Sequence, residues 1–325
     1  MVLDHYYVRT TGNCYGVIVG NDHAPFYYIG YLKYCQASVE TLWKDSYGFY
    51  TRLVKIYTPS QVHESTGWKQ YIPYYDSLIP IIPSSVILEV YDPIMRTREL
   101  FSRPTDPLET EASRLLDILH NCTGLSTGIG VTGSLLPRIH NPFKSDIDLV
   151  VYGWRESVKA IECLNEVDLL RPFEGSLLRE WALRVSENTG ISVRTAEKLY
   201  RKYRRGLFHS LAYSIIFDRD YGESILLKPS YHTLGVIIIV GVIEGGLEAL
   251  SYPSSSKLSQ YVIVKSSVNP PYPIDEIVSI DSLYIPVLFE GGKALIKGLL
   301  QCSSVTESCR ILVGGVEEKG FIEPE

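Results

Sequence analysis

Residues 130–152 read GVTGSLLPRIHNPFKSDIDLVVY, and the second half of this stretch alternates acidic and apolar residues before it becomes wholly apolar. Successive side chains of a strand point to opposite faces, so Asp146 and Asp148 share one face while Ile147 and Leu149 face a core. Two neighbouring carboxylates repel each other unless a cation lies between them, and paired oxygen ligands suit Mg²⁺. The pattern therefore predicts a magnesium site at the two aspartates.

The first half of the stretch predicts a turn that binds phosphate. Gly130-Val131-Thr132 has the composition of a short strand, and it ends at Gly133-Ser134. Glycine permits close approach of the backbone, and exposed N–H groups at a turn or helix start bind phosphate oxygens. A phosphate-binding turn and a divalent metal pair in one unit indicate phosphoryl or nucleotidyl transfer.

The order Gly133-Ser134, a loop over 135–145, and Asp146-Ile147-Asp148-Leu149 resembles the signature of the nucleotidyltransferase superfamily that includes DNA polymerase beta. The overall layout also resembles a group of archaeal predicted nucleotidyltransferases of uncharacterised function. The resemblance implies an Mg²⁺-dependent enzyme that moves NMP from an NTP to a hydroxyl acceptor by a two-metal mechanism. It implies that Gly133 and Ser134 hold the NTP phosphates and that Asp146 and Asp148 bind the metals. RNA is one of the acceptors that it allows.

The superfamily uses a third carboxylate, on a later strand, which completes the metal site and takes the proton from the attacking hydroxyl. Asp218, at the end of a strand predicted over 207–217, is our candidate for this catalytic and metal-binding role. Asp220 is an alternative in the following turn, and Ser214 would hold the position if the strand ended earlier. The metal site would then be incomplete, and the chain would be a catalytically inactive module that binds nucleotide or RNA.

Basic residues near these motifs are candidates for contact with phosphate. Lys144 lies just before Ser145 and Asp146, and we assign it a nucleotide-binding role. A helix predicted over 195–203 carries or adjoins six basic residues, which are spaced around more than one face, so we expect most of them to be solvated. One or two could still reach a triphosphate or an RNA backbone. These six are Arg194, Lys198, Arg201, Lys202, Arg204 and Arg205. His140, in the loop before Asp146, is predicted to be an ordinary surface histidine.

A second motif overlaps the first, because residues 128–133 match G-x-G-x-x-G. A dinucleotide-binding fingerprint needs an apolar strand directly before the first glycine and a helix after the last. Residues 124–127 instead have the composition of a turn, and Pro137 and Pro142 interrupt any following helix. We therefore discount a nicotinamide cofactor.

The composition is that of an ordinary soluble protein, with 45% hydrophobic and 21% charged residues in 325. The net charge of −6 argues against a strongly basic nucleic-acid binder. The longest apolar run, over 234–243, is too short to cross a bilayer, so no membrane partner is expected. The first residues lack a basic region followed by an apolar stretch, so we expect a cytoplasmic protein.

The six cysteines include no C-x-x-C pair, so a structural zinc site is not predicted. In an ordinary cytosol they would be buried thiols. The presence of only two methionines hints at a thermophile, in which intracellular disulfides do occur. Cys14 with Cys35 and Cys302 with Cys309 are then the candidate pairs.

These patterns together predict the α+β class, with a central nucleotidyltransferase core made of a small mixed sheet and helices. Domains rich in β-structure are predicted to flank this core on both sides. The predicted divisions are a β-rich domain over 1–92, a connection over 93–106, the core over 107–222, and a small barrel or sandwich over 223–325.

Two local predictions define the limits of the core. Its first helix is expected to begin at Asp106, with Pro107 at the first helical position and Glu109 at the third. Beyond the core, the first strand of the C-terminal domain is predicted at 225–228.

Overall fold

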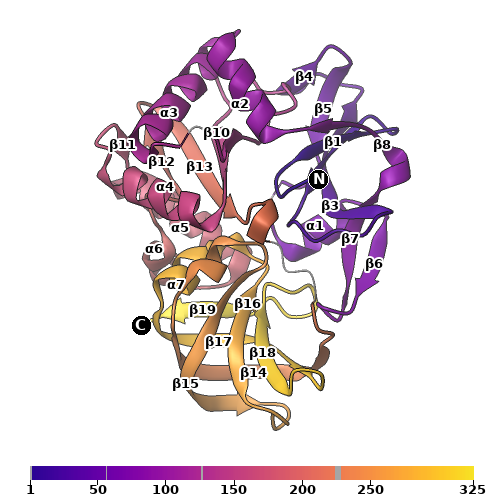
Figure 1. The fold of residues 1–325 in the computed structure, drawn as a ribbon, viewed down its shortest axis with the longest axis vertical. Helices are drawn as coiled ribbons and strands as arrows, with labels where there is room; N and C mark the ends of the chain where they lie inside the picture. The colour runs from indigo at the N-terminus through magenta and orange to yellow at the C-terminus, as the bar shows by residue number, and fades with distance from the viewer. Residues whose placement is uncertain (1, 56, 126, 224–227) are drawn as a thin grey trace.

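Three β-sheets dominate the computed structural model, which describes residues 2–55, 57–125, 127–223 and 228–325 (Figure 1). Of the chain, 38% is strand and 27% is helix, and these described residues form 19 strands. The prediction of an α+β fold around a helix-packed nucleotidyltransferase core is therefore wrong. The protein is β-rich, with a half-barrel sheet and a closed five-stranded barrel.

An eight-stranded sheet comes from the N-terminal part of the chain, drawn in indigo and purple in Figure 1. Its main path runs β4-β5-β3-β2-β1-β8, and β7 pairs with both β3 and β6. Tyrosine, valine and isoleucine are frequent here because they fit a half-buried pleated surface. The strands are β1 (Tyr7–Thr10), β2 (Cys14–Ile18), β3 (Tyr27–Ala37), β4 (Trp43–Asp45), β5 (Gly48–Arg52), β6 (Lys69–Ile72), β7 (Ser77–Pro83) and β8 (Ile87–Tyr91), with helix α1 (Pro59–Glu64) between β5 and β6.

The middle of the chain forms a five-stranded sheet in the order β11-β12-β13-β10-β9. Strands β10 and β13 are parallel, and the other neighbours are antiparallel. The strands are β9 (Ile129–Val131), β10 (Ile147–Tyr152), β11 (Leu170–Arg171), β12 (Arg205–Phe208) and β13 (Leu211–Asp218). The helices of this part are α2 (Pro93–Ser102), α3 (Pro107–Thr123), α4 (Trp154–Glu166), α5 (Gly175–Thr189) and α6 (Val193–Leu199).

The two faces of β10 explain why the predicted core is not an independent helix-packed unit. Ile147, Leu149 and Val151 are fully buried in one cluster with apolar side chains of α3 and α4. Val150 and Tyr152, on the opposite face, pack instead against residues of the N-terminal sheet such as Val8 and Ile18. A sheet, rather than a second layer of helices, therefore covers the face of β10 to which Asp146 and Asp148 belong.

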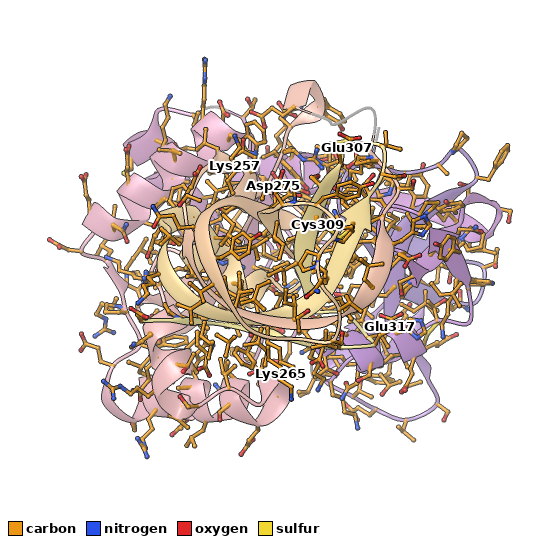
Figure 2. The ribbon with its side chains drawn as sticks, turned by 90° about the horizontal axis from the view of Figure 1, so that it is seen from below. Lys257, Lys265, Asp275, Glu307, Cys309 and Glu317 are labelled. Atoms are coloured by element: carbon orange, nitrogen blue, oxygen red, sulfur yellow. A yellow bond between two sulfur atoms is a disulfide. The ribbon has the colours of Figure 1, made fainter. Side chains whose placement is uncertain are left out.

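The C-terminal part forms a barrel, drawn in orange and yellow (Figure 1). Its strands follow the order β14-β15-β16-β18-β17, and pairing of β14 with β17 closes it, while β19 extends β17. Figure 2 views this barrel from below, with apolar side chains filling it and Cys309 among them. The elements are β14 (His232–Ile243), β15 (Ser254–Ser266), β16 (Ile274–Ser279), α7 (Ile285–Glu290), β17 (Gly292–Ser303), β18 (Ser308–Val313) and β19 (Phe321–Pro324).

Several local predictions can be compared directly with these elements. The helix predicted from Asp106 is confirmed, because the Asp106 side chain accepts a hydrogen bond from the Glu109 backbone at the start of α3. The segment 93–106, predicted as a connection, contains helix α2. The single strand predicted over 207–217 is instead a hairpin of β12 and β13. The strand predicted at 225–228 lies, apart from Lys228, outside the described residues.

Three disulfides involve all six cysteines. Cys14–Cys35 joins β2 to β3 and Cys302–Cys309 joins β17 to β18, in both cases between residues directly opposite in the strand register. The third, Cys122–Cys163, joins α3 to α4 and was not among the predicted pairs. The first two pairs are therefore confirmed, and the sequence missed the pair that links two helices.

Candidate functional site

Asp146 and Asp148, together called the aspartate pair, lie at the start of β10. Asp146 is exposed and directly precedes the strand, and Asp148 is half-buried within it. Ile147 and Leu149 are completely buried on the opposite face, as their alternation predicts. The Asp148 carbonyl accepts a 2.8 Å hydrogen bond from the Thr132 backbone, which ties β10 to the segment before the Gly133-Ser134 turn.

Gly133 lies directly against the carboxylate of Asp148. A Cβ atom built on Gly133 would lie 2.1 Å from Asp148 Oδ2, and the backbone there has a φ of +65°. Only glycine fits both the left-handed backbone and the close approach. Ser134 is buried, and its carbonyl accepts a hydrogen bond from Ile139, which folds residues 133–138 into a compact turn. The turn and the aspartate pair are therefore neighbours.

The charge of Asp148 perturbs the carboxylate of Asp146. The pKa of Asp146 is raised to about 6, first because Asp148 carries a like charge nearby and second because surrounding protein reduces hydration of the carboxylate. Lys33 and Arg52 act in the opposite direction on the same pKa but do not cancel the rise. The two carboxylates at the start of β10 therefore repel each other, and a cation bound between them would relieve that repulsion.

Lys33 and Arg52 come from the N-terminal sheet that covers this face of β10. The Lys33 side chain is buried, and its Nζ donates a 2.8 Å hydrogen bond to the Tyr7 hydroxyl and lies 5.4–5.6 Å from the ring centres of Tyr7, Tyr34 and Tyr57. The Arg52 guanidinium lies 5.2 Å from the Tyr57 ring centre. The faces of aromatic rings attract cations at such distances, so these tyrosines help to hold both side chains in place.

Arg205 supplies a third cation, from β12. The Cα of Arg205 is paired with that of Ser214 on β13, and Ser214 is paired with Asp148 on β10. Paired residues share a face, so Arg205, Ser214 and Asp148 form one row across the sheet. Burial lowers the pKa of the Arg205 guanidinium, while the charges of Asp148 and Asp146 oppose that fall. Within the described ranges, none of Lys33, Arg52 and Arg205 forms an ion pair within 4.0 Å.

The structure does not bring Asp218 to the aspartate pair, so its assignment as third carboxylate needs correction. Asp218 is paired with Tyr152, four residues further along β10 than Asp148 and hence roughly 13 Å away. It is fully buried, and its Oδ1 accepts hydrogen bonds from the backbone of Arg219 and Tyr252. The position beside Asp148 belongs to Ser214, whose hydroxyl donates a 2.5 Å hydrogen bond to Asp148 Oδ1.

The other basic candidates mostly have structural partners. Lys144 is exposed in the short loop closed by hydrogen bonds between Asn141 and Ser145. Arg201 forms an ion pair with Glu290, and Lys202 donates to the backbone carbonyls of Asn165 and Val167. Arg204, also buried, donates to the Ile215 carbonyl. Of the six residues in the basic segment, Arg205 is therefore the one that the fold directs toward the aspartate pair.

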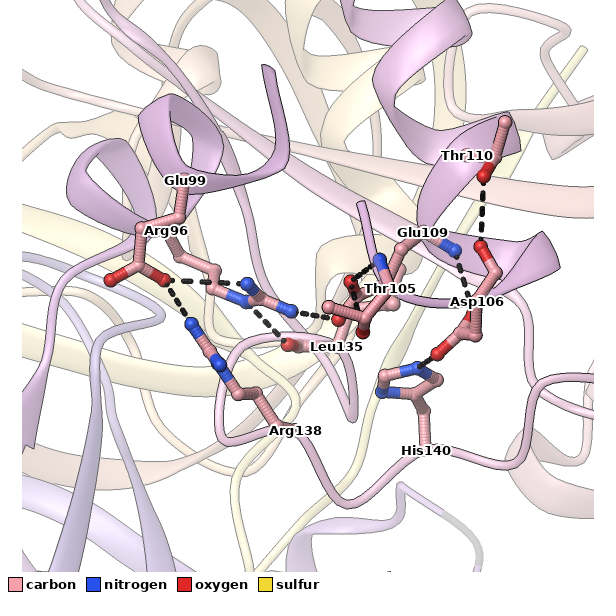
Figure 3. Close-up of polar contacts among 9 residues, drawn as sticks. All are labelled: Arg96, Glu99, Thr105, Asp106, Glu109, Thr110, Leu135, Arg138 and His140. Atoms are coloured by element: carbon pink, nitrogen blue, oxygen red, sulfur yellow. Dashed lines mark hydrogen bonds and ion pairs between the residues drawn. The ribbon is translucent and has the colours of Figure 1, made fainter. Parts of the chain in front are cut away.

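A second group, Asp106, Glu109 and His140, could hold a metal ion, because one ligand atom from each lies within 4.8 Å of the others (Figure 3). Among the described residues it is the one group of three or more such side chains. Sequence reasoning treated its members separately, as a helix start and a surface histidine. His140 is in fact nine-tenths buried, and its Nε2 lies 2.7 Å from Asp106 Oδ2.

The ligand atoms of this second group already have protein partners. Glu109 Oε2 accepts hydrogen bonds from the backbone and hydroxyl of Thr105, both at 2.8 Å, and Glu109 Oε1 pairs with the buried Arg96. Asp106 Oδ1 caps α3. A metal ion would have to replace the Arg96 ion pair. No described residue, by contrast, forms an ion pair with Asp146 or Asp148. The aspartate pair is therefore the better candidate for a functional cation site.

Comparison of the chain with protein-family models, with curated proteins and with solved structures finds no match. In the part of the chain that the structure describes, no helix combines the length and the apolar character needed to cross a membrane.

Proposed function

We propose that the aspartate pair binds a nucleoside triphosphate together with Mg²⁺. The observation that carries the proposal is the charge arrangement at the start of β10. The charges of Lys33 and Arg52 act on Asp146, and the charges of both aspartates act on Arg205. Among the described residues, none of these three cations forms an ion pair within 4.0 Å. A complex of Mg²⁺ with a nucleoside triphosphate satisfies both sets of charges. The metal ion offers positive charge to the two carboxylates, and the phosphates offer negative charge to the three cations.

The donor set at this site suits magnesium. Carboxylate oxygens are the ligands that Mg²⁺ prefers, and it commonly takes one or two of them together with substrate phosphates and water. Asp146 and Asp148 would hold the ion, and when bound it would neutralise phosphate charge. The Gly133-Ser134 turn, Lys33, Arg52 and Arg205 would contact the phosphates, because backbone N–H groups, ammonium and guanidinium groups are their ordinary partners.

Binding, rather than rapid transfer of NMP, is the activity that this site supports best. Two-metal phosphoryl transfer relies on carboxylates that bind both metals, and Ser214 occupies the place next to Asp148 where a third carboxylate would belong. The resemblance of the Gly-Ser and Asp-x-Asp motifs to nucleotidyltransferases fits either activity. We therefore propose a magnesium-dependent nucleotide-binding protein.

One observation favours transfer to a hydroxyl acceptor as a second candidate. Asp146 is exposed at the start of β10, beside the proposed phosphate-binding turn, so its carboxylate is open to a hydroxyl acceptor. RNA and other hydroxyl-bearing molecules are the acceptors to try, with NTP labelled at the α-phosphate. Incorporation of label that depends on Mg²⁺ and is lost in Asp146→Asn would establish this second candidate.

Equilibrium binding of the four labelled NTPs, with Mg²⁺ and with EDTA, tests the proposed function. We expect at least one NTP to bind in Mg²⁺, with at least tenfold weaker binding in EDTA and in Asp146→Asn. The matched control is Asp168→Asn, which removes the same charge from an exposed position outside the site. Equal binding by wild type and Asp146→Asn, or no NTP binding at all, would refute the proposal.

A further inference from the structure

A surface groove of about 560 Å³ lies beside the Asp106 group, between α2 and the turn at residues 133–138. It is lined by Met95, Arg98, Glu99 and Ser102 of α2, by Arg103 and Thr105 beyond its end, and by Arg138 of the turn. Its volume lies within the range of ligand sites, and six of its seven lining residues carry a polar or charged side chain.

The groove carries a surplus of positive charge on an acidic protein. Three arginines and one glutamate line it, while the whole chain has a net charge of −6. Arg138 pairs with Glu99 at 2.7 Å. The exposed guanidinium groups of Arg98 and Arg103 have no hydrogen bond or ion pair with any described residue. Two guanidinium groups are therefore free to bind an anion, and phosphate suits their planar geometry.

Arg138 is held toward the groove at a cost in backbone energy. Its φ of +58° lies in the left-handed region, which costs a residue with a side chain about 1–2 kcal/mol. The turn is fastened to α2 by the buried Arg96, whose Nε donates to the Leu135 carbonyl at 3.2 Å and whose guanidinium also pairs with Glu109 (Figure 3). The backbone of the turn that carries Arg138 is thus held against α2.

The same turn connects the groove to the aspartate pair. Gly133 begins the turn and lies against Asp148, and Arg138 ends the turn. At most about 18 Å of chain separates Gly133 from Arg138. A ligand reaching both places needs phosphates spaced along its length. The lining includes no aromatic side chain for base stacking, so contact with the phosphate backbone is the chemistry that it offers.

We propose that the Arg98-Arg103-Arg138 groove binds the phosphodiester backbone of a single-stranded nucleic acid, whose end extends toward the aspartate pair. The direction of the strand rests on the proposed nucleotide-binding function of that pair. The groove itself is a separate site, with its own residues and no requirement for magnesium.

Fluorescence anisotropy with a labelled twelve-nucleotide RNA, and with DNA of the same sequence, tests the groove in EDTA. Arg98→Ala with Arg103→Ala should weaken binding at least tenfold at low salt. The slope of log affinity against log salt should fall by about 1.4, because two phosphate contacts to a single strand are lost. The matched control is Arg155→Ala with Lys159→Ala, two exposed basic residues of α4. It should leave affinity within twofold.

Three results would refute oligonucleotide binding by the groove. The first is no binding of the oligonucleotide, and the second is an equal loss of affinity in the groove and control variants. The third is displacement of the oligonucleotide by polyglutamate or by ATP in EDTA as effective as displacement by unlabelled oligonucleotide. The last result would assign the groove to free anions. Asp148→Asn separates the two proposals, since it should lose Mg·ATP while keeping oligonucleotide affinity. If the wild type binds Mg·ATP but not the oligonucleotide, the proposal for the groove is refuted while the proposal for the aspartate pair stands.

Discussion

Asp148 and Ser214 lie directly opposite each other on the parallel strands β10 and β13, and the Ser214 hydroxyl donates a 2.5 Å hydrogen bond to Asp148 Oδ1. This contact fixes one oxygen of Asp148 and leaves Oδ2 facing Gly133. It also places a neutral hydroxyl where a third acid would complete a carboxylate site.

Ser214→Asp should convert the aspartate pair into a three-carboxylate site. We expect at least tenfold tighter Mg²⁺ binding, because a third hard oxygen ligand joins the first two. In EDTA the same variant should be less stable by about 1 kcal/mol, since like charges then face each other across the strands. Calorimetric Mg²⁺ titration and urea unfolding measure the two effects, with Ser214→Ala as the control that removes only the hydroxyl. Unchanged Mg²⁺ affinity in Ser214→Asp would show that Asp148 does not bind the ion.

Gly133→Ala should impair both folding and nucleotide binding. The new methyl group meets Asp148 Oδ2 and the backbone keeps a positive φ, so we expect a loss of about 2–4 kcal/mol in the free energy of unfolding. Gly175→Ala is the matched control, because its φ is +54° but nothing lies within 4 Å of the added atom. That control should lose only about 1–2 kcal/mol and keep nucleotide binding. Equal losses in the two variants would mean that Asp148 does not contact the turn.

Asp218 should make stability depend on pH in the direction opposite to that of an ion-paired acid. Burial raises the pKa of this carboxyl well above its usual value of 3.8, and the charge of Asp4 raises it further. The folded protein therefore keeps a proton that the unfolded chain releases, so stability is greatest below about pH 4 for this group and falls as pH rises through the folded pKa. Asp218→Asn removes that slope. Urea unfolding from pH 4 to 9 measures it, and identical slopes in wild type and variant would contradict the assignment.

The three disulfides should differ in their contribution to stability in the order of the loops that they close. The sequence separations are 41 for Cys122–Cys163, 21 for Cys14–Cys35 and 7 for Cys302–Cys309. A disulfide restricts the unfolded chain more when it closes a longer loop. Removing each one by paired Cys→Ala substitution should therefore lower the free energy of unfolding by about 4, 3.4 and 2.5 kcal/mol, in that order. Urea unfolding of the three double variants, with the disulfide-intact wild type as reference, tests the order. A smaller loss for Cys122–Cys163 than for Cys302–Cys309 would contradict it.

The sequence was sufficient to predict features that depend on local chemistry. The start of α3 followed from Asp106, Pro107 and Glu109, because capping needs only neighbouring residues. The burial of Ile147 and Leu149 followed from alternation along one strand. Each of these signals lies within a few residues, so no knowledge of tertiary packing was needed.

The failures concern contacts between distant segments. The fold class was wrong because alternation in β10 shows that one face is buried, but not that the N-terminal sheet covers the opposite face. Asp218 was misplaced because the hairpin of β12 and β13 sets the register, and it brings Ser214 rather than Asp218 beside Asp148. Lys33 and Arg52, more than ninety residues before the aspartate pair, carried no local signal except many tyrosines around them.

Calorimetric titration of ATP into wild type and Asp148→Asn, each in Mg²⁺ and in EDTA, tests the central claim most directly. The account predicts binding by the wild type in Mg²⁺, and binding at least tenfold weaker in each of the other three titrations. Equal affinity of wild type and Asp148→Asn in Mg²⁺, or equal affinity of the wild type with and without Mg²⁺, would contradict it.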